Sequence, residues 1–390
     1  MKKIILLFLG VVVVSSFSFS NVLFNYSHSA INENEAENGK NRIEKEFEAV
    51  PGGKIDINLK TAGSISVSCS NNSKVSVKII STSDEINVNC QKNDDEIQVS
   101  SEYVTEENNS NSKVRVLVKV PNEFNVQFSA LKGNVELNGI KGGFEGRAVS
   151  GNISANNIEG NAELKTVRGN ITVKDSKLTG AAHTVKGDIT LSGVDGDFKT
   201  SSVSGKIKTN CLKREKHYDD GAIFIKSLGG EIEIDSAPHG GRLKTLGGNI
   251  KVGSAKDFIN ANTLGGDISL DNIDGSINAK TLGGNINAKM IGDPESGDRH
   301  ITLESLGGDI TLFVPADLSM NIEVELGKTS NYHGECEVSS DFKFSSKVVH
   351  KERNFSMPNR VYSTYKSNVN GGKNKVVIKT TNGNIRIKKL

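Results

Sequence analysis

The chain has 390 residues, with 48 lysines and arginines against 46 aspartates and glutamates, so its formal net charge is +2. This near balance, with no cluster of arginines and only 5% aromatic residues, argues against a nucleic-acid-binding protein. Glycine is abundant at 40 residues, proline is scarce at 6 and tryptophan is absent, which indicates frequent tight turns between strands.

The first residues have the features of an export signal. Two lysines precede an apolar run over residues 4–14, and small residues follow in Ser-x-Ser patterns that suit a signal peptidase. We therefore expect residues 1–30 to be a signal peptide. The alternative is an uncleaved anchor, because residues 4–24 are long enough to span a bilayer. The polar segment 31–46 is expected to be a linker.

Residues 47–125 are expected to form an N-terminal region of short β-strands. Apolar and polar residues alternate in every segment of this region, as in residues 55–59 and 114–120. Strict alternation is typical of half-buried strands, and the Gly, Asn, Ser and Asp clusters between the segments are typical of turns. No apolar stripe of helical periodicity runs for three turns, so almost no helix is expected beyond the signal segment.

An 18-residue repeat begins near residue 131. The glycine that marks each unit stands at Gly133, Gly151, Gly169, Gly187 and Gly205, then at Gly230, Gly248, Gly266, Gly284 and Gly308. Insertions near residues 212–220 and at 293–298 are the two breaks in the spacing. A fixed period of this kind indicates a solenoid whose coils pack on their neighbours. We predict an all-β chain with a β-helix-like solenoid of about ten coils over residues 126–314.

The columns of the repeat predict what each position does. The Val or Ile two residues after the glycine and the Val or Leu two residues before it are both expected to stack into the apolar core. The Asn or Asp directly after the glycine is expected to hydrogen-bond to the next coil, and the Thr or Ser three residues before it to neighbouring backbone. A second turn signal nine residues on favours two strands per coil, and a three-sided coil is the alternative.

Beyond residue 314 the period lapses. Residues 315–390 are expected to be an irregular β region that ends in a cap, because the repeat pattern returns once, at 380–387. A solenoid needs covered ends to prevent edge-to-edge growth.

The four cysteines, Cys69, Cys90, Cys211 and Cys336, have no Cys-x-x-Cys spacing, and no histidine stands at metal-ligand spacing from another. No metal site is therefore predicted. Cys69 and Cys90 each end a strand-like run, so a disulfide between them and two unpaired thiols are both open.

One column of the repeat, four residues before the glycine, is mostly basic. Its members are Arg147, Lys165, Lys226, Lys244 and Lys280, with His183 among them. One hypothesis is that this face binds an anionic polymer, and the alternative is a solvated strand face whose lysines resist aggregation. For His183 we expect an ordinary outward position on the surface.

No pattern in the sequence identifies a catalytic residue or a cofactor site. A calcium-binding β-roll also uses coils of two nonapeptides, but it requires Gly-Gly-x-Gly-x-Asp, and here no second glycine follows the Gly-Gly pair and its polar neighbour. The enzymatic alternative is a polysaccharide-acting β-helix enzyme, which needs carboxylates or basic residues gathered in a groove.

The order of these features resembles the bacterial adhesin-like family of β-strand repeat proteins known as domain of unknown function 4097. The residues that carry the likeness are 47–53, 55–57, 63–67, 118–121, the repeats such as 263–268, and 381–385. Over residues 47–390 the resemblance implies a secreted or cell-envelope β-solenoid with no catalytic residues. Residues 319–374 depart from the family's plain pattern, so the likeness does not define their architecture.

These observations predict an exported, non-enzymatic structural or interaction protein of the cell surface or envelope. Its expected partner is a protein or an envelope polymer, with membrane contact only through an N-terminal anchor. A polysaccharide-acting enzyme and an envelope-stress accessory protein are the alternatives.

Overall fold

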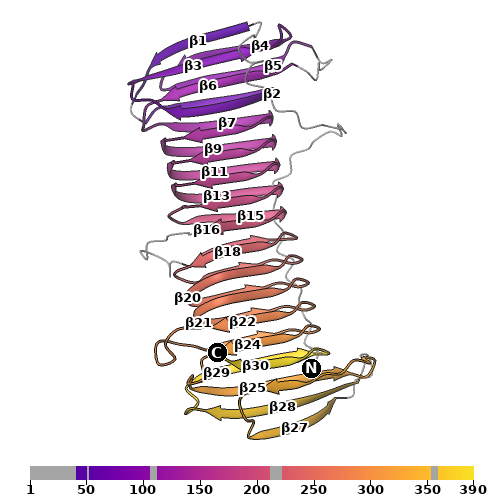
Figure 1. Ribbon diagram of the computed structural model, residues 1–390. Helices are drawn as coiled ribbons and strands as arrows, with labels where there is room; N and C mark the ends of the chain where they lie inside the picture. Colours follow the sequence, from indigo (N-terminus) through magenta and orange to yellow (C-terminus); the bar gives the residue numbers. More distant parts are fainter. Residues whose placement is uncertain (1–40, 51, 106–111, 211–221, 353–358) are drawn as a thin grey trace, which may run out of the picture.

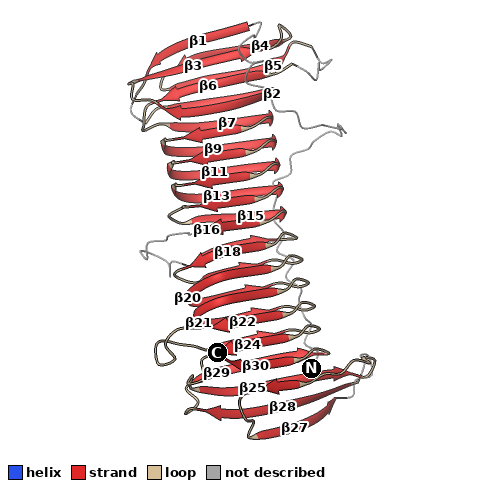
Figure 2. Cartoon of the chain, viewed as in Figure 1, coloured by secondary structure: helices blue, strands red, loops and turns tan. Residues whose placement is uncertain are grey.

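A computed structural model describes residues 41–50, 52–105, 112–210, 222–352 and 359–390. All regular structure in these ranges is β-strand, in 30 strands (Figure 2). Within the same ranges, no helix is long and apolar enough to cross a membrane. The predicted signal peptide or anchor, residues 1–30, lies outside the described residues.

The strands stack into a long rod made of two sheets that face each other (Figure 1). Sheet 1 contains, from the N-terminal end of the rod, β4 (Ile86–Asn93), β5 (Glu96–Tyr103), the first half of β2 (Lys54–Cys69), β7 (Asn125–Lys132), β9 (Lys141–Ser150), β11 (Glu159–Arg168), β13 (Lys177–Lys186), β15 (Phe198–Ser204), β17 (Ile223–Ser227), β19 (Gly241–Lys244), the ends of β20 (Ile250–Asn262) and β21 (Ile268–Lys280), β23 (Ile301–Glu304), β29 (Asn374–Thr381), β25 (Met320–Thr329), β28 (Arg360–Val369) and β27 (Ser346–Glu352).

Sheet 2 contains, in the same direction, β1 (Asn41–Glu48), β3 (Lys74–Ser81), β6 (Val114–Val120), the second half of β2, β8 (Val135–Asn138), β10 (Ile153–Asn156), β12 (Ile171–Lys174), β14 (Ile189–Ser192), β16 (Ile207–Asn210), β18 (Ile232–Ala237), the starts of β20 and β21, β22 (Ile286–Met290), β24 (Ile310–Val314), β30 (Ile385–Lys389) and β26 (Val338–Ser340). Strands β2, β20 and β21 run through both sheets and join them. Each coil thus has one strand segment in each sheet, which confirms the prediction of two strands per coil.

The core lies between the two sheets. The Val or Ile column two residues after the repeat glycine is at most 1% exposed from Val135 to Ile310, as predicted. Consecutive coils place these side chains directly above one another, as in the pairs Ile153 with Ile171 and Ile171 with Ile189. Adjacent parallel strands lie about 4.8 Å apart, so each coil covers the apolar surface of the one before it.

The prediction that the Val or Leu column two residues before the glycine is also core is wrong. Eight of its ten members are between 41% and 56% exposed. The Thr or Ser one position earlier is buried in this chain, as at Thr166 and Thr263. In the first five units both positions lie in a strand, and because successive side chains of a strand point to opposite faces, the buried residue directs the following Val or Leu outward. In the last five units the leucine lies in the turn just beyond the strand.

The two polar columns have the hydrogen bonds that were predicted for them. The Thr166, Thr263 and Thr380 hydroxyls donate to the glycine carbonyl of the preceding coil at 3.2, 2.9 and 2.7 Å. The Asn side chains accept hydrogen bonds from backbone N–H groups of the next coil. The N–H of Asn170 donates to Asn152 Oδ1 at 2.8 Å, and the N–H of Asp309 donates to Asn285 Oδ1 at 2.8 Å.

The repeat glycine is required by the close approach of neighbouring coils. Gly151 has a φ of +150°, and a Cβ at this position would lie 1.9 Å from the carbonyl oxygen of Gly133. No side chain fits such a gap, and a positive φ is unfavourable for other residues. The glycine column therefore follows from the stacking itself.

The solenoid extends beyond both predicted boundaries. Parallel pairing already begins at β2, which pairs with β7 and β8, so the described part of residues 47–125 belongs to the same rod. At the other end, β29 and β30 pair in parallel with β23 and β24 and complete a further coil. In sequence, residues 315–373 separate these two coils, and β25 of this segment pairs with β29 on the side away from β23.

Antiparallel strands close both ends of the rod. At the N-terminal end β1 pairs with β3 and β4 with β5, and at the C-terminal end β25, β28 and β27 form an antiparallel group. The predicted linker 31–46 is wrong for residues 41–46, because they form β1. Charged residues of β1 pair across to β3, with Lys78 Nζ 3.7 Å from Glu44 Oε1, although the segment lacks apolar periodicity.

Candidate functional site: the outer face of sheet 1

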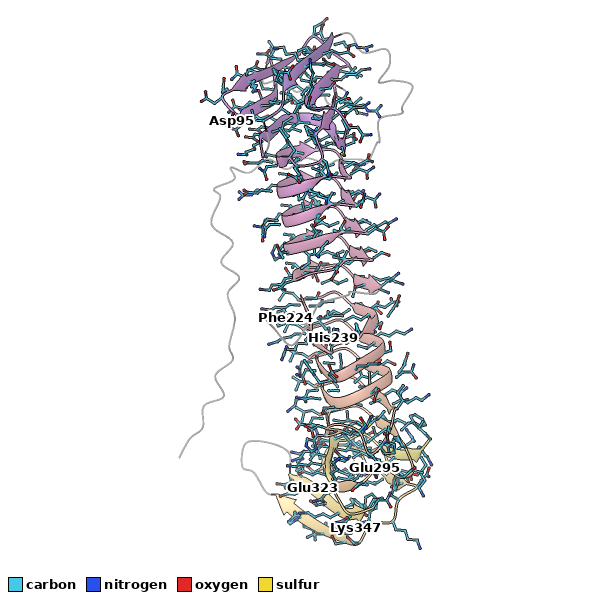
Figure 3. The ribbon with its side chains drawn as sticks, turned by 90° about the vertical axis from the view of Figure 1, so that its left-hand side faces the viewer. Asp95, Phe224, His239, Glu295, Glu323 and Lys347 are labelled. Carbon is cyan, nitrogen blue, oxygen red and sulfur yellow. The ribbon has the colours of Figure 1, made fainter. Side chains whose placement is uncertain are left out.

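The predicted basic column lies on the outer face of sheet 1. The parallel register aligns Arg147 with Lys165, Lys165 with His183, and Lys226 with Lys244, and it places Lys280 two coils further on, beyond Asn262. The structure therefore brings the five predicted residues into one line along the rod, with Ser201 and Asn262 between them. Figure 3 shows the side chains that project from the rod, with Phe224 near its middle.

This line is not a continuous cationic surface. Arg147 Nη2 lies 3.3 Å from Glu145 Oε1, Lys165 Nζ lies 3.4 Å from Glu163 Oε2, and Lys280 Nζ lies 3.1 Å from Glu304 Oε2. Lys226 and Lys244 have no carboxylate partner among the described residues. Binding of an anionic polymer along the whole column stays a prediction, with two unpaired cations at its centre.

His183 is half-buried within this line. Its Nδ1 lies 2.6 Å from Ser201 Oγ, on the next coil. Burial lowers the pKa of His183, Lys165 lowers it further, and Glu163 opposes this effect. The imidazole is thus a neutral hydrogen-bonding link between coils at neutral pH.

An exposed apolar line runs beside the charged one. We call it the apolar ridge, and it consists of the residues two before each repeat glycine: Leu131, Val149, Val167, Val185, Val203, Leu228, Leu246, Leu264, Leu282 and Leu306. In each coil the ridge residue stands two positions after the charged column. From Leu131 to Val203 both positions lie in one strand and on the same face of it, and from Leu228 to Leu306 the ridge residue lies in the turn just beyond the strand. Large exposed apolar patches on soluble proteins mark interaction sites. The ridge is therefore the most informative surface feature of the rod.

The sequence places the ridge residues in one column of the repeat, but it does not determine the direction of their side chains. In eight of the ten units a Thr or Ser directly precedes the ridge residue and is buried, as Thr263 is before Leu264. The apolar character of the Val or Leu column by itself predicts a core position, which the structure corrects. Only the burial of the hydroxyl column distinguishes the two assignments.

Near the C-terminal end of the rod, the ridge and the charged column form the walls of a groove. The groove has a volume of about 470 Å³. Leu264, Leu282 and Leu306 line it together with Lys280 and Arg360. The C-terminal strands β25 and β28, which follow β29 in sheet 1, supply the lining residues Glu325 and Arg360.

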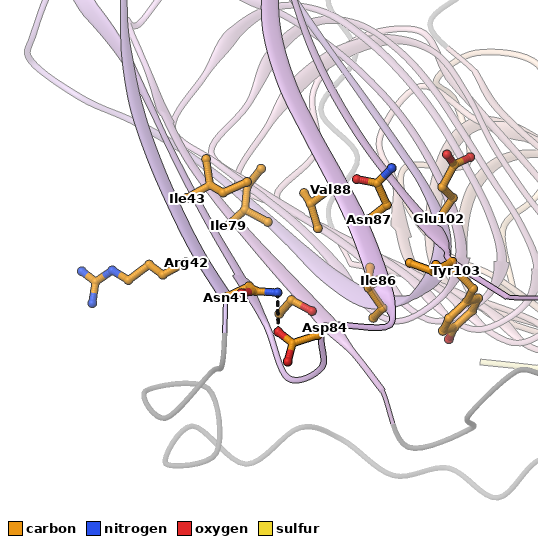
Figure 4. Close-up of a pocket in the computed structure, with 12 residues that line it drawn as sticks. Asn41, Arg42, Ile43, Ile79, Asp84, Ile86, Asn87, Val88, Glu102 and Tyr103 are labelled. Carbon is orange, nitrogen blue, oxygen red and sulfur yellow. Dashed lines mark hydrogen bonds between the residues drawn. The ribbon is translucent and has the colours of Figure 1, made fainter.

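A second hollow of about 580 Å³ lies at the N-terminal end, where the two sheets diverge (Figure 4). Its apolar surface comes from Ile43 and Ile79 of sheet 2 and from Ile86 of sheet 1. At its rim, Asn41 Nδ2 donates to Asp84 Oδ1 at 2.8 Å. This hollow is the end of the core rather than a cluster of reactive groups.

The disulfide between Cys69 and Cys90 is not formed, so the alternative of unpaired thiols describes both residues. Cys69, Cys90 and Cys336 are free, and Cys211 lies outside the described residues. Cys90 is paired through Val99 to the part of β2 in sheet 1, whereas Cys69 stands in the part of β2 in sheet 2. Burial raises the pKa of the Cys90 thiol, with Lys45 opposing the effect.

The part of the chain that the structure describes contains no group of three or more His, Cys, Asp or Glu residues that could hold a metal ion. The two carboxylates that line the groove are held in ion pairs, Glu304 with Lys280 and Glu325 with Lys379. The predicted second insertion, 293–298, is anchored by Arg299, which is 2% exposed. The first insertion, near 212–220, lies outside the described residues.

Comparison with solved structures gives similar chains of low sequence identity. They include a "putative cell adhesion protein" from Clostridium sporogenes, 13% identical, with 90% of this chain and 100% of that chain covered and a TM-score of 0.14. A "putative adhesin" from Bacteroides fragilis is 13% identical, with coverages of 89% and 97% and a TM-score of 0.22. A "putative lipid binding protein" from Parabacteroides distasonis is 15% identical, with coverages of 70% and 98% and a TM-score of 0.28.

No curated protein matches the chain. The model of the Toastrack DUF4097 family matches residues 53–252. This match covers the start of the rod, from β2 into β20, and half of the chain. It agrees with the parallel coils and the repeat columns described above, and the chain belongs to the Toastrack DUF4097 family.

Proposed function

We propose that this protein is an exported, non-catalytic, adhesin-like protein of the cell surface or envelope, which binds its partner along the outer face of sheet 1. The observation that carries the proposal is the apolar ridge, whose members are up to 56% exposed. Each coil presents the same pair of features, an apolar side chain and a polar or charged one, at a spacing of about 4.8 Å.

Repetition of a weak contact is an effective way to bind an extended partner. When several sites bind one molecule, each later contact is intramolecular, and the total affinity exceeds that of a single site by orders of magnitude. Solenoids commonly use such extended surfaces for binding. A protein or an envelope polymer of regular structure fits this geometry, and the signal-like residues 1–30 support export.

The test of the proposed face is binding of the purified chain to cell-envelope fractions. We expect the double variant Val167→Ser, Val185→Ser to bind at least about tenfold more weakly, because two of the repeated apolar contacts are lost. Its thermal midpoint should stay close to that of the wild type, since both side chains are 41–44% exposed. The matched control is Val348→Ser, a 50% exposed valine outside the ridge.

Equal binding by the ridge variant and the wild type would contradict the proposed face. The localisation is tested separately by deletion of residues 1–30, which we expect to abolish export. An unchanged distribution of the protein after this deletion would contradict an exported location.

A further inference from the structure

The apolar ridge ends at an arginine. Thr381 occupies the ridge position of the last coil, two residues before Gly383, and it follows Leu306 in the stack. The guanidinium of Arg360, which comes from β28 in the C-terminal group, donates through Nη2 to Thr381 Oγ1. The leucine line of the groove therefore leads directly to a cationic group.

The groove has an excess of positive charge. Four cations and two carboxylates line it, which leaves two positive charges in excess. Lys280 is paired with Glu304 at 3.1 Å, and Lys379 with Glu325 at 3.4 Å. Among the described residues, Arg360 and Lys244 have no carboxylate partner.

Arg360 is also incompletely satisfied. Its Nε is buried without a hydrogen-bond partner, and the one hydrogen bond of its guanidinium within the described residues is the bond to Thr381. A guanidinium with unused donors is stabilised by hydrogen bonds to an anion, because its planar N–H groups match the oxygens of a carboxylate or phosphate.

We propose that the groove binds a single-chain anionic amphiphile, with its carboxylate or phosphate head at Arg360 and its apolar tail along Leu306, Leu282 and Leu264. The volume of about 470 Å³ lies within the range of small-molecule sites. A single row of leucines can contact one alkyl chain along its length. An added peptide strand has no place here, since β21, β23 and β29 are each paired on both sides.

The groove lies at the C-terminal end of the face that the proposed function assigns to partner binding. The amphiphile site rests on that proposed function only in using the same exposed ridge. It is tested by titration calorimetry of the purified chain with dodecanoate, dodecyl phosphate and the uncharged dodecyl maltoside, all below micelle formation. We expect saturable binding of the two anions and none of the maltoside. The comparison of the two anions distinguishes a carboxylate head from a phosphate head.

Two kinds of variant locate the site. Arg360→Gln should weaken binding of the anions by about tenfold or more, because a charge-assisted hydrogen bond is lost, whereas Arg360→Lys should weaken it less. Leu282→Ser should weaken binding about tenfold through lost apolar contact. The matched controls are Arg147→Gln and Val185→Ser, which alter the same two lines outside the groove and should leave the affinity unchanged.

Absence of dodecanoate and dodecyl phosphate binding would overturn the proposal. Equal losses in the groove variants and the controls would also overturn it, as would binding of anionic vesicles without binding of either monomeric amphiphile. If the amphiphile site fails while Val167→Ser, Val185→Ser still lowers binding to envelope fractions, the proposed function stands alone. Circular dichroism melting of each variant identifies any loss that comes from unfolding.

Discussion

At the residue scale, the glycine column shows how stacking selects a residue type. Each repeat glycine contacts the carbonyl of the glycine one coil earlier, and Gly151 and Gly169 would each place a Cβ 1.9 Å from that oxygen. A spacing of this kind can be read from the sequence as a period. Its cause, the close approach of two backbones, exists only once the coils are stacked.

The change Gly151→Ala is expected to lower the free energy of unfolding by at least about 2 kcal/mol, because it combines a backbone clash with an unfavourable φ. The measurement is the midpoint of thermal or urea denaturation. The matched control is Gly283→Ala, where a Cβ meets no atom within 4 Å, and its midpoint should be close to that of the wild type. Equal midpoints for both variants would contradict the stacking role of Gly151.

His183 makes a pH-dependent contribution to the free energy of unfolding. Burial lowers its pKa below the ordinary 6.5, assisted by Lys165 and opposed by Glu163. As the pH falls below 6.5, the unfolded chain therefore takes up a proton more readily than the folded chain, and acidification lowers the free energy of unfolding.

We expect His183→Gln to lose less thermal stability than the wild type between pH about 7 and pH about 5, because the titrating group is removed. The measurement is the thermal midpoint at the two pH values. His333→Gln, at an exposed position in the C-terminal region, serves as the control and should behave as the wild type. A wild-type pH dependence in His183→Gln would show that His183 is not its source.

At the scale of elements, the second insertion demonstrates how an irregular loop is attached to a regular coil. Arg299 Nη2 donates to Asp274 Oδ1 at 2.6 Å, Nη1 to Ile291 O at 2.7 Å, and Nε to Ser296 O at 2.9 Å. A single buried side chain thus connects the loop to two neighbouring segments. The sequence marks the insertion by its break in period, but nothing in it identifies Arg299 as the anchor.

Arg299→Met should lower the free energy of unfolding by about 3 kcal/mol, because it removes three hydrogen bonds of one buried side chain at about 1 kcal/mol each. Denaturation monitored by circular dichroism measures the effect. Arg386→Met is a suitable comparison, since its pair with Asp309 is 40–42% exposed, and it should cost about 1 kcal/mol or less. A smaller effect at Arg299 than at Arg386 would contradict the anchoring role.

At the scale of the whole molecule, the register produces surfaces that no single coil has. Parallel pairing in steps of 18 residues places Ile153 over Val135 and Thr166 over Ala148, and it repeats this relation along the rod. The same operation lines up the exposed valines and leucines into the apolar ridge. A feature of modest size in one coil thereby becomes a line of side chains over ten coils.

The sequence by itself determined the all-β class, the 18-residue coil, the buried Ile column from Val135 to Ile310 and the hydrogen-bonding roles of the Thr and Asn columns. These follow from local periodicity, which reports which side chains repeat and at what interval. The tertiary structure decided the direction of the Val or Leu column, the extent of the rod and the approach of Arg360 to Thr381. They depend on the fold of segments far apart in sequence, since residue 360 reaches the groove only when β28 pairs with β25 and β29 resumes the coil.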